Sequence, residues 1–202
     1  MSSAHSSGET SLLDALSVNL QSIRLTEEQF YRLCEDNPEL RLELTARGEL
    51  IVMSPTGSKT GLRNSRLNTQ LGEWAQKHGG GVTFDSSTGF ALPNGAKRST
   101  DASWLPKECW NALTAAEQDG FAPLCPDFVV ELRSPRDSAA ALKKKMSEYV
   151  ENGALLGWLV DPIDKCVYVF RPGEPLQCLE HPSRVEGDPI LTGFVLELDE
   201  IW

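Results

Sequence analysis

The segment Phe128–Leu132 constrains the fold more than any other part of this 202-residue chain. It reads Phe-Val-Val-Glu-Leu and is bounded by Pro126 on one side and by Ser134-Pro135 on the other. A short and nearly continuous apolar run of this kind is typical of a strand that is buried on both faces. Glu131 interrupts the run, and a carboxylate in a buried strand needs a charged partner or a metal ion. The sequence therefore predicts a covered sheet with an acid at its centre.

Helix and strand patterns alternate along the rest of the chain. The capping-box pattern of Thr26–Gln29 begins a helix, and the apolar alternation over 40–44 and 49–53 predicts an N-terminal β-hairpin. Asp137 or Ser138 caps a helix that runs to about residue 152. We further expect a helix over 60–77, a short helix and loop over 108–119, and strands at 82–85, 89–92, 99–105, 156–160, 166–170 and 194–198. This order predicts an α/β (α+β) fold, with a mixed β-sheet flanked by helices.

The N-terminus and the cysteines indicate a cellular compartment. Residues 1–10 are rich in Ser and lack both early basic residues and an apolar segment, so no signal peptide is expected. The five cysteines form no Cys-x-x-Cys pair and the three histidines do not cluster with them, which argues against a zinc site or disulfide framework and fits a reducing cytoplasm. No apolar run approaches the ~20 residues of a membrane span. We expect a poorly ordered tail over 1–22 and a single domain over 23–202.

Strand geometry favours one acidic partner for Glu131 without by itself selecting it. Asp127 and Glu131 invite a literal reading as a metal-binding PD…ExK string, but four residues along a strand separate side chains by about 13 Å. Because Mg²⁺ holds its oxygen ligands at about 2.0–2.1 Å, these two acids cannot share one ion. Asp101 fits better if it lies on a neighbouring strand, where cross-strand Cβ atoms are about 4.5–5.5 Å apart. With a lysine nearby, this pair suits metal-assisted phosphodiester hydrolysis, although an acid at a solvated sheet edge is the competing interpretation.

Several basic groups compete for the position beside these acids. On the helix expected over 138–152, Lys143 and Lys145 flank the apolar stripe about equally, while Lys144 faces water. Helical geometry therefore does not choose between Lys143 and Lys145, and a solvated basic face remains the alternative for all three lysines. Arg133 lies two residues after Glu131 on the same strand face, and an arginine can stabilise a developing phosphorane although it cannot give up its proton.

Six motifs, in this order, resemble those of one protein family. They are Leu42–Leu44, Gly48–Pro55, Ser99–Trp104, Pro126–Pro135, Lys145–Tyr149 and Gly157–Pro162. Over roughly residues 25–202, the chain resembles the Uma-type family of "putative restriction endonucleases" in the PD-(D/E)XK nuclease superfamily. The resemblance implies a restriction-endonuclease-like fold and a divalent metal, Mg²⁺ (or Mn²⁺), held by Asp101 and Glu131. It also implies that Lys145 is the catalytic lysine.

The chain departs from the family pattern in places. Thr100 stands where the family usually has a proline before the aspartate, and Thr60–Asn64 replaces a helix start at which many members carry a histidine. Superfamily members often have a glutamate near the metal on the first helix, but Glu73 faces away from the apolar helix face. Two glutamates of the hairpin are alternative third acids, and the number of metal ions stays open. The auxiliary candidates are Glu43, Glu49, Thr60, Asn64 and Arg133.

The formal net charge of −10 argues at first against a nucleic-acid partner, because Lys and Arg drive phosphate binding. The charge is unevenly distributed, however. Residues 54–104 hold six basic and three acidic side chains, and residues 132–147 hold five and one. These stretches contain Asp101 and directly follow Glu131, so we expect a basic rim that binds DNA weakly and in a salt-sensitive manner. The rim candidates are Lys59, Arg63, Arg66, Lys97, Arg98 and Arg136.

These patterns together predict a metal-dependent endonuclease that hydrolyses DNA phosphodiester bonds with metal-activated water. The alternative is a nuclease-fold module that binds nucleic acid or regulates without turnover. The presence of Asp101, Glu131 and Lys145 favours the enzyme. A homodimer would suit a nuclease that cuts both strands, although nothing in the sequence requires one, and the sequence does not distinguish DNA from RNA.

Overall fold

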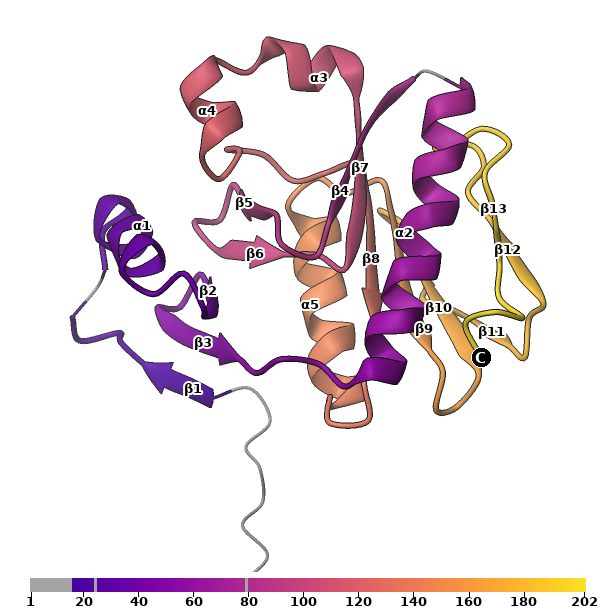
Figure 1. Cartoon of the computed structure of the whole chain (residues 1–202), viewed down its shortest axis with the longest axis horizontal. Coiled ribbons are helices and arrows are strands. Elements are labelled where there is room, and N and C mark those ends of the chain that lie inside the picture. Colours follow the sequence, from indigo (N-terminus) through magenta and orange to yellow (C-terminus); the bar gives the residue numbers. More distant parts are fainter. Residues whose placement is uncertain (1–15, 24, 79) are drawn as a thin grey trace, which may run out of the picture.

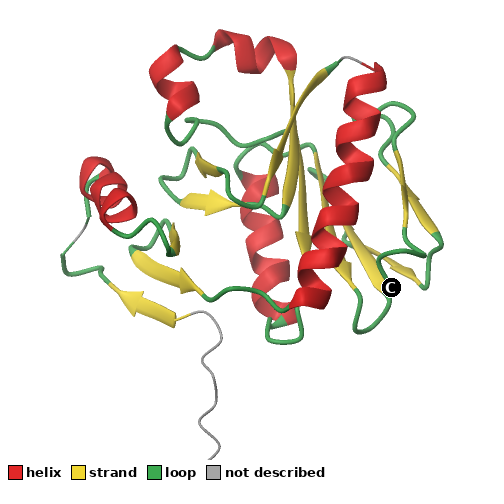
Figure 2. Cartoon of the chain, in the orientation of Figure 1, coloured by secondary structure: helices red, strands yellow, loops and turns green. Residues whose placement is uncertain are grey.

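The computed structural model describes residues 16–23, 25–78 and 80–202. Its six-stranded sheet is mixed and carries helices on its faces, which confirms the predicted α/β fold class (Figure 2). Figure 1 shows two main parts. A large sheet lies between the long helices α2 (Ser58–His78) and α5 (Ala139–Glu151), and an N-terminal sheet lies beside it.

The larger sheet has six strands in the order β11-β10-β9-β8-β7-β4. Strands β8 and β9 pair in parallel and are connected by the crossover helix α5. All other neighbouring strands of this sheet pair antiparallel. Strands β8 and β9 are buried along their whole length, as their apolar sequences predict. The strands are β4 (Gly81–Asp85), β7 (Ala102–Pro106), β8 (Phe128–Leu132), β9 (Leu156–Asp161), β10 (Cys166–Phe170) and β11 (Gln177–Glu180).

The two faces of β8 pack against different helices. Phe128, Val130 and Leu132 share one hydrophobic core with residues of α2. Val129 belongs to a second core, which it shares with residues of α5. Because side chains alternate along a strand, Glu131 lies on the same face as Val129. Glu131 therefore faces α5, the helix that carries the three lysines.

Helix α5 lies close to the sheet at Gly157. A Cβ atom at this position would lie 2.5 Å from Cε of Met146 and 3.4 Å from Cγ2 of Val129, so a side chain here would have to displace the end of the Met146 side chain. Of the two predicted caps of α5, Ser138 is the one that accepts a hydrogen bond from the backbone N–H of Ala141. The helix that carries the lysines is thus fixed both at its start and along its length.

The N-terminal sheet has the order β1-β3-β2-β6-β5 and contains the predicted hairpin. Helix α1 (Glu27–Asp36) begins with the predicted capping box of Thr26 and Gln29, and Phe30 packs against Leu42 and Leu44 on one face of this sheet. The opposite face of the hairpin is left for other contacts. The strands are β1 (Leu16–Asn19), β2 (Arg41–Leu44), β3 (Glu49–Met53), β5 (Gly89–Ala91) and β6 (Lys97–Ser99).

The predicted tail over residues 1–22 is wrong at β1. Leu16 to Asn19 pair antiparallel with β3, from Leu16 opposite Val52 to Asn19 opposite Glu49. The edge of β3 supplies hydrogen-bond partners for β1, and local composition does not reveal them. The tail was predicted from the Ser-rich composition of the residues before β1. Residues 1–15 of the predicted tail lie outside the described residues.

The strand predicted over 99–105 is two strands. β6 ends at Ser99 in the N-terminal sheet and β7 begins at Ala102 in the larger sheet, so Thr100 and Asp101 lie at the junction. Strands β11 and β12 were not predicted, because they are short and polar. The segment expected over 108–119 forms two short helices. The remaining elements are α3 (Lys107–Ala112), α4 (Ala115–Asp119), β12 (Arg184–Glu186) and β13 (Val195–Glu197).

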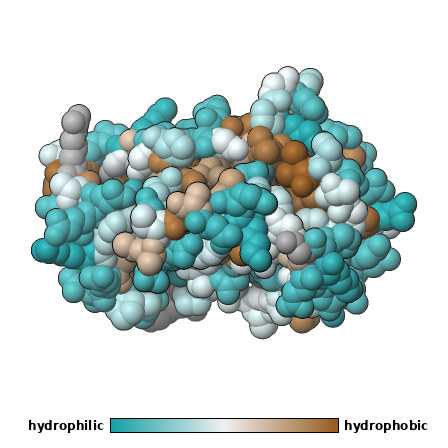
Figure 3. Space-filling view, turned by 90° about the horizontal axis from the view of Figure 1, so that it is seen from above, coloured by the Kyte–Doolittle hydropathy of each residue, from teal (hydrophilic) through white to brown (hydrophobic). Residues whose placement is uncertain are grey.

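Within the described ranges, no helix combines the length and the apolar character that a membrane crossing requires. The face seen from above in Figure 3 is mainly hydrophilic, with separate apolar patches between polar residues. The long helices α2 and α5 instead direct their apolar faces to the two cores of the larger sheet.

Candidate active site

A groove of about 1580 Å³ runs between the N-terminal sheet and the larger sheet. The hairpin β2–β3 and the first turns of α2 contribute one part of its lining. The other part comes from Arg98, Ser99 and Asp101, from the end of β8 and from the exposed face of α5. Asp101, Glu131 and Lys145 all line this groove.

Asp101 and Glu131 come together because β7 and β8 are neighbours. Ala102 pairs with Val130, and the N–H of Asp101 donates to the carbonyl of Val130 at 3.0 Å, so the next residues on each strand adjoin. Oδ2 of Asp101 accepts a hydrogen bond of 2.8 Å from the N–H of Leu132. The two acids thus occupy the neighbouring positions that strand geometry predicts.

Burial dominates the electrostatics of these two acids. It raises the pKa of Glu131 to about 7, although the charge of Lys145 acts in the opposite direction. Burial also raises the pKa of Asp101, although the hydrogen bond from Leu132 lowers it. Two desolvated carboxylates at one edge of a groove are a site where a cation gains a large electrostatic advantage.

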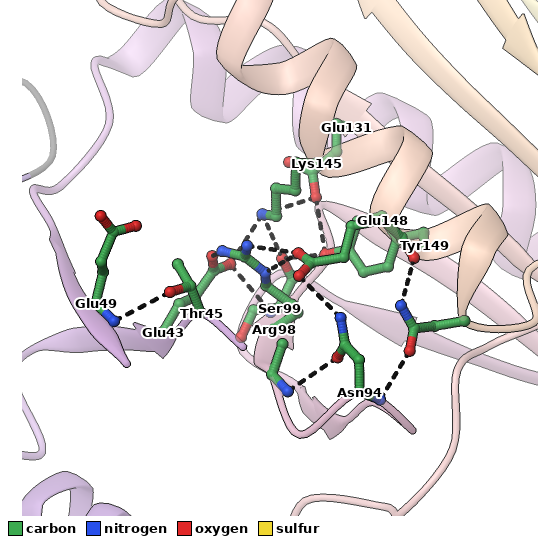
Figure 4. Close-up of polar contacts among 12 residues, drawn as sticks. Glu43, Thr45, Glu49, Asn94, Arg98, Ser99, Glu131, Lys145, Glu148 and Tyr149 are labelled. Atoms are coloured by element: carbon green, nitrogen blue, oxygen red, sulfur yellow. Dashed lines mark hydrogen bonds and ion pairs between the residues drawn. The ribbon is translucent and has the colours of Figure 1, made fainter. Parts of the chain in front are cut away.

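Lys145 is the lysine that reaches Glu131. Its Nζ lies 2.9 Å from Oε1 of Glu131, 2.8 Å from Oε1 of Glu43 and 2.9 Å from the carbonyl oxygen of Ser99 (Figure 4). Burial alone would lower the pKa of Lys145, but the charges of Glu131 and Glu43 raise it above its ordinary value. Lys145 is therefore a cation at neutral pH.

The other basic candidates point elsewhere. Nζ of Lys143 lies over the ring of Tyr168, 3.6 Å from its centroid. Nη1 of Arg133 pairs with Asp161 at 2.7 Å and with Asp164 at 3.1 Å. The structure therefore brings neither group to Glu131 and separates two lysines that helical geometry could not distinguish.

Tyr149 is a neighbour of Glu131 whose contact the sequence did not single out. Its hydroxyl lies 3.2 Å from Oε1 of Glu131 and 3.1 Å from the carbonyl oxygen of Ser99. Burial, with the charges of Glu131 and Glu43, raises its pKa, so the hydroxyl keeps its proton. The signal was its spacing, since Tyr149 follows Lys145 by four residues and shares its helix face.

Glu43 continues the ion pairs on the side of Lys145 away from Glu131. Its Oε2 accepts from Nη1 of Arg98 at 2.9 Å, and Arg98 pairs in turn with Glu148 at 2.5 Å. Burial alone would raise the pKa of Glu43, but Lys145 and Arg98 together hold it below its ordinary value. Acids and bases thus alternate from Glu131 through to Glu148 (Figure 4).

The remaining auxiliary candidates line the groove without joining these ion pairs. Thr60, Asn64 and Glu49 are part of the lining. The amide of Asn64 lies 3.5 Å from Oδ1 of Asp101, whereas Glu49 stands apart from the group around Lys145 (Figure 4). Asn68 was missed, although it follows Asn64 by one helical turn and donates to the carbonyl of Asp101 at 3.0 Å.

The predicted basic rim divides into groove residues and structural residues. Lys59 and Arg136 line the groove, and Arg98 does so with its charge already paired. Lys97 pairs with Glu27 at 2.6 Å, and Arg66 contacts Glu200. Arg63 also lies outside the lining. Three lining residues were missed: Arg41, Arg47 and Lys144.

The donor set suits a hard cation. Within the described ranges, no group of three or more His, Cys, Asp or Glu side chains is arranged to hold a metal. Mg²⁺ is nevertheless commonly bound by one or two carboxylates together with substrate phosphates and water. The described residues place only one long hydrogen bond on Oδ1 of Asp101 and none on Oε2 of Glu131, and both acids open to the groove. The pair therefore fits such an ion.

Comparisons with known proteins agree with this architecture. A family model described as "Uma2: Putative restriction endonuclease" matches residues 27–199. A similar solved structure is that of "a putative nuclease belonging to DUF820" from Anabaena variabilis, with a TM-score of 0.71 and 20% sequence identity. The match covers 88% of this chain and 97% of that one, so the two proteins share a fold. No curated protein matches the chain.

Proposed function

The chain belongs to the Uma2 family of "putative restriction endonucleases", and from this premise we propose that it is a metal-dependent endonuclease that hydrolyses phosphodiester bonds of DNA. The observation that carries the proposal is the convergence of Asp101, Glu131 and Lys145 at one groove. Two carboxylates and one ammonium group are the side chains that metal-assisted phosphate chemistry uses.

Asp101 and Glu131 are the residues that would hold the cation, Mg²⁺ or Mn²⁺. When bound, such an ion supplies Lewis-acid stabilisation of the phosphate and makes a coordinated water more acidic. Glu131 comes from β8, and Asp101 lies directly before β7 and is hydrogen-bonded to Val130 and Leu132 of β8, so their separation is set before substrate arrives. Lys145, a cation at neutral pH, would offset the charge that develops on the phosphate and orient the attacking water.

The test is cleavage of nucleic acid by the purified full chain. We expect cleavage of duplex DNA in the presence of Mg²⁺ or Mn²⁺ and none in EDTA. Single-stranded DNA and RNA of the same sequence, assayed in parallel, define the preferred form. Binding of DNA without cleavage under any of these conditions would contradict the proposal and favour the regulatory module.

The groove lining also predicts how the protein holds DNA. Replacing Lys59 with Ala removes one exposed lining cation, so the slope of log affinity against log salt should become shallower by about 0.9. Binding of a fluorescein-labelled DNA duplex in EDTA, followed by anisotropy over a salt series, measures this slope.

Arg66→Ala is the matched control for Lys59→Ala. Both residues lie on α2, but Arg66 lies outside the groove lining and contacts Glu200, with its Nε 3.8 Å from Oε2. We expect the Arg66→Ala slope to equal that of the unaltered protein. Equal slopes for both variants would remove the groove as the DNA-binding surface.

A further inference from the structure

The ammonium group of Lys145 has no spare donor in this structure. It carries three N–H groups, and three oxygens, from Glu43, Ser99 and Glu131, lie within 2.9 Å of it. Contact with a phosphate oxygen of a substrate therefore requires Lys145 to exchange one of these three partners.

Glu43 is the partner that can best be exchanged. Without Lys145, its carboxylate keeps the hydrogen bond from Nη1 of Arg98 at 2.9 Å and the one from the N–H of Ser99 at 3.1 Å. Glu131 would keep only the neutral hydroxyl of Tyr149 among the described residues. Since a buried carboxylate without a cation is costly, release from Glu43 is less unfavourable than release from Glu131.

Arg98 is well placed to remain behind as the cation of Glu43. Its Nε and Nη2 bind Oε2 of Glu148 at 2.7 and 2.5 Å, and Oε1 of Glu148 accepts from the amide of Asn94 at 3.1 Å. Its side chain is 9% exposed, so these contacts fix a nearly buried guanidinium group. Arg98 therefore stays in position whether or not Lys145 contacts Glu43.

The groove allows a phosphate to reach both Glu43 and Lys145. Glu43 and Lys145 both line it, and they belong to opposite sides, Glu43 to the N-terminal sheet and Lys145 to α5. A phosphate oxygen and the Glu43 carboxylate are both anionic acceptors, so one can replace the other beside the same ammonium group.

We propose that Glu43 is a positioning residue that binds Lys145 in the substrate-free protein. A phosphate of the substrate then replaces Glu43 as a partner of Lys145, while Arg98 stays as the counter-ion of Glu43. This inference rests on the proposed function for its biological meaning. The exchange itself is a property of three named contacts and is measurable without turnover.

The experiment compares Glu43→Gln with Glu148→Gln. Both variants remove one negative charge from a partner of Arg98, but only Glu43 contacts Lys145. The protein is labelled with [ε-¹⁵N]lysine, and the Nζ signal of Lys145 is identified by its loss in Lys145→Arg. Inorganic phosphate is the probe. We expect phosphate to perturb the Lys145 signal at about tenfold lower concentration in Glu43→Gln than in the unaltered protein or in Glu148→Gln.

Glu43→Asp protects the test against misfolding of Glu43→Gln. It keeps the negative charge for Arg98 but shortens the side chain by one methylene, so the contact with Lys145 should weaken and the response to phosphate should again increase. Equal phosphate responses in the unaltered protein, both Glu43 variants and Glu148→Gln would overturn the proposal.

Cleavage assays on the same variants separate the two proposals. If the unaltered protein cleaves no DNA but Glu43→Gln sensitises Lys145 to phosphate, the exchange stands and the nuclease proposal fails. If the protein cleaves DNA but substitution of Glu43 does not change the response of the Lys145 signal to phosphate, the nuclease proposal stands and the exchange is wrong.

Discussion

Replacing Glu131 with Gln should lower metal-dependent DNA cleavage by about 10²–10³-fold, the effect typical of losing one electrostatic contact at a reacting phosphate or carbonyl centre. The change keeps the shape of the side chain but removes the charge that would bind the cation. Lys145 retains Glu43 as a carboxylate partner, so the variant should remain folded. Initial rates of plasmid nicking, with circular dichroism to monitor folding, measure the effect.

Asp127→Asn is the matched control for Glu131→Gln. Asp127 lies just before β8 and is the acid that a literal reading of the sequence would choose, but it is not part of the groove lining. Its substitution should leave the nicking rate within about twofold of the unaltered protein, since surface substitutions away from a site are usually nearly neutral. A large loss in Asp127→Asn together with normal rates in Glu131→Gln would reverse the assignment of the acid.

Replacing Lys145 with Met should abolish measurable cleavage and also destabilise the protein by about 3–5 kcal/mol, because the buried Glu131 loses its cation and Glu43 keeps only Arg98. Side chains of Glu43 and Glu131 are only 2% and 6% exposed, so water replaces the lost charge poorly. Urea unfolding followed by tryptophan fluorescence measures the free energy of unfolding.

The same substitution at Lys143 gives the comparison. Lys143 lies two residues earlier on the same helix, with its Nζ over the ring of Tyr168. Lys143→Met should lower the free energy of unfolding by less than about 1 kcal/mol, the range of an exposed cation–π contact, and should leave cleavage intact. Equal stability losses in the two variants would mean that Lys145 is not the cation of the buried acids.

The larger sheet could be predicted because its determinants are local. The apolar run of β8 marked a buried strand, and Glu131 within it marked a buried charge that needs a partner or a metal. Strand spacing made Asp101 a candidate, and the family resemblance assigned it. The break of the predicted strand at Thr100 could not be predicted, because it depends on which of two sheets each half joins.

The choice of lysine could not be made from helical geometry for a similar reason. Lys143 and Lys145 flank the apolar stripe of α5 at similar angles, and what separates them is Glu43, about a hundred residues earlier in the chain. Arg98 and Lys97 were assigned to the DNA-binding rim by counting charge. Their acidic partners, Glu43, Glu148 and Glu27, come from distant elements, so local sequence could not reveal that these charges are already used.

The way the N-terminal sheet is attached has a mechanical consequence. In the described part of the chain, β2 meets β6 through a single registered pair, Leu44 opposite Lys97. Two ion pairs bridge the same junction, because Lys97 pairs with Glu27 of α1 and Arg98 pairs with Glu43 of β2. If Arg98 keeps its contact with Glu43 when Lys145 turns to a phosphate, β2 stays in place as a wall of the groove. The width of the groove and the position of the lysine are then controlled separately.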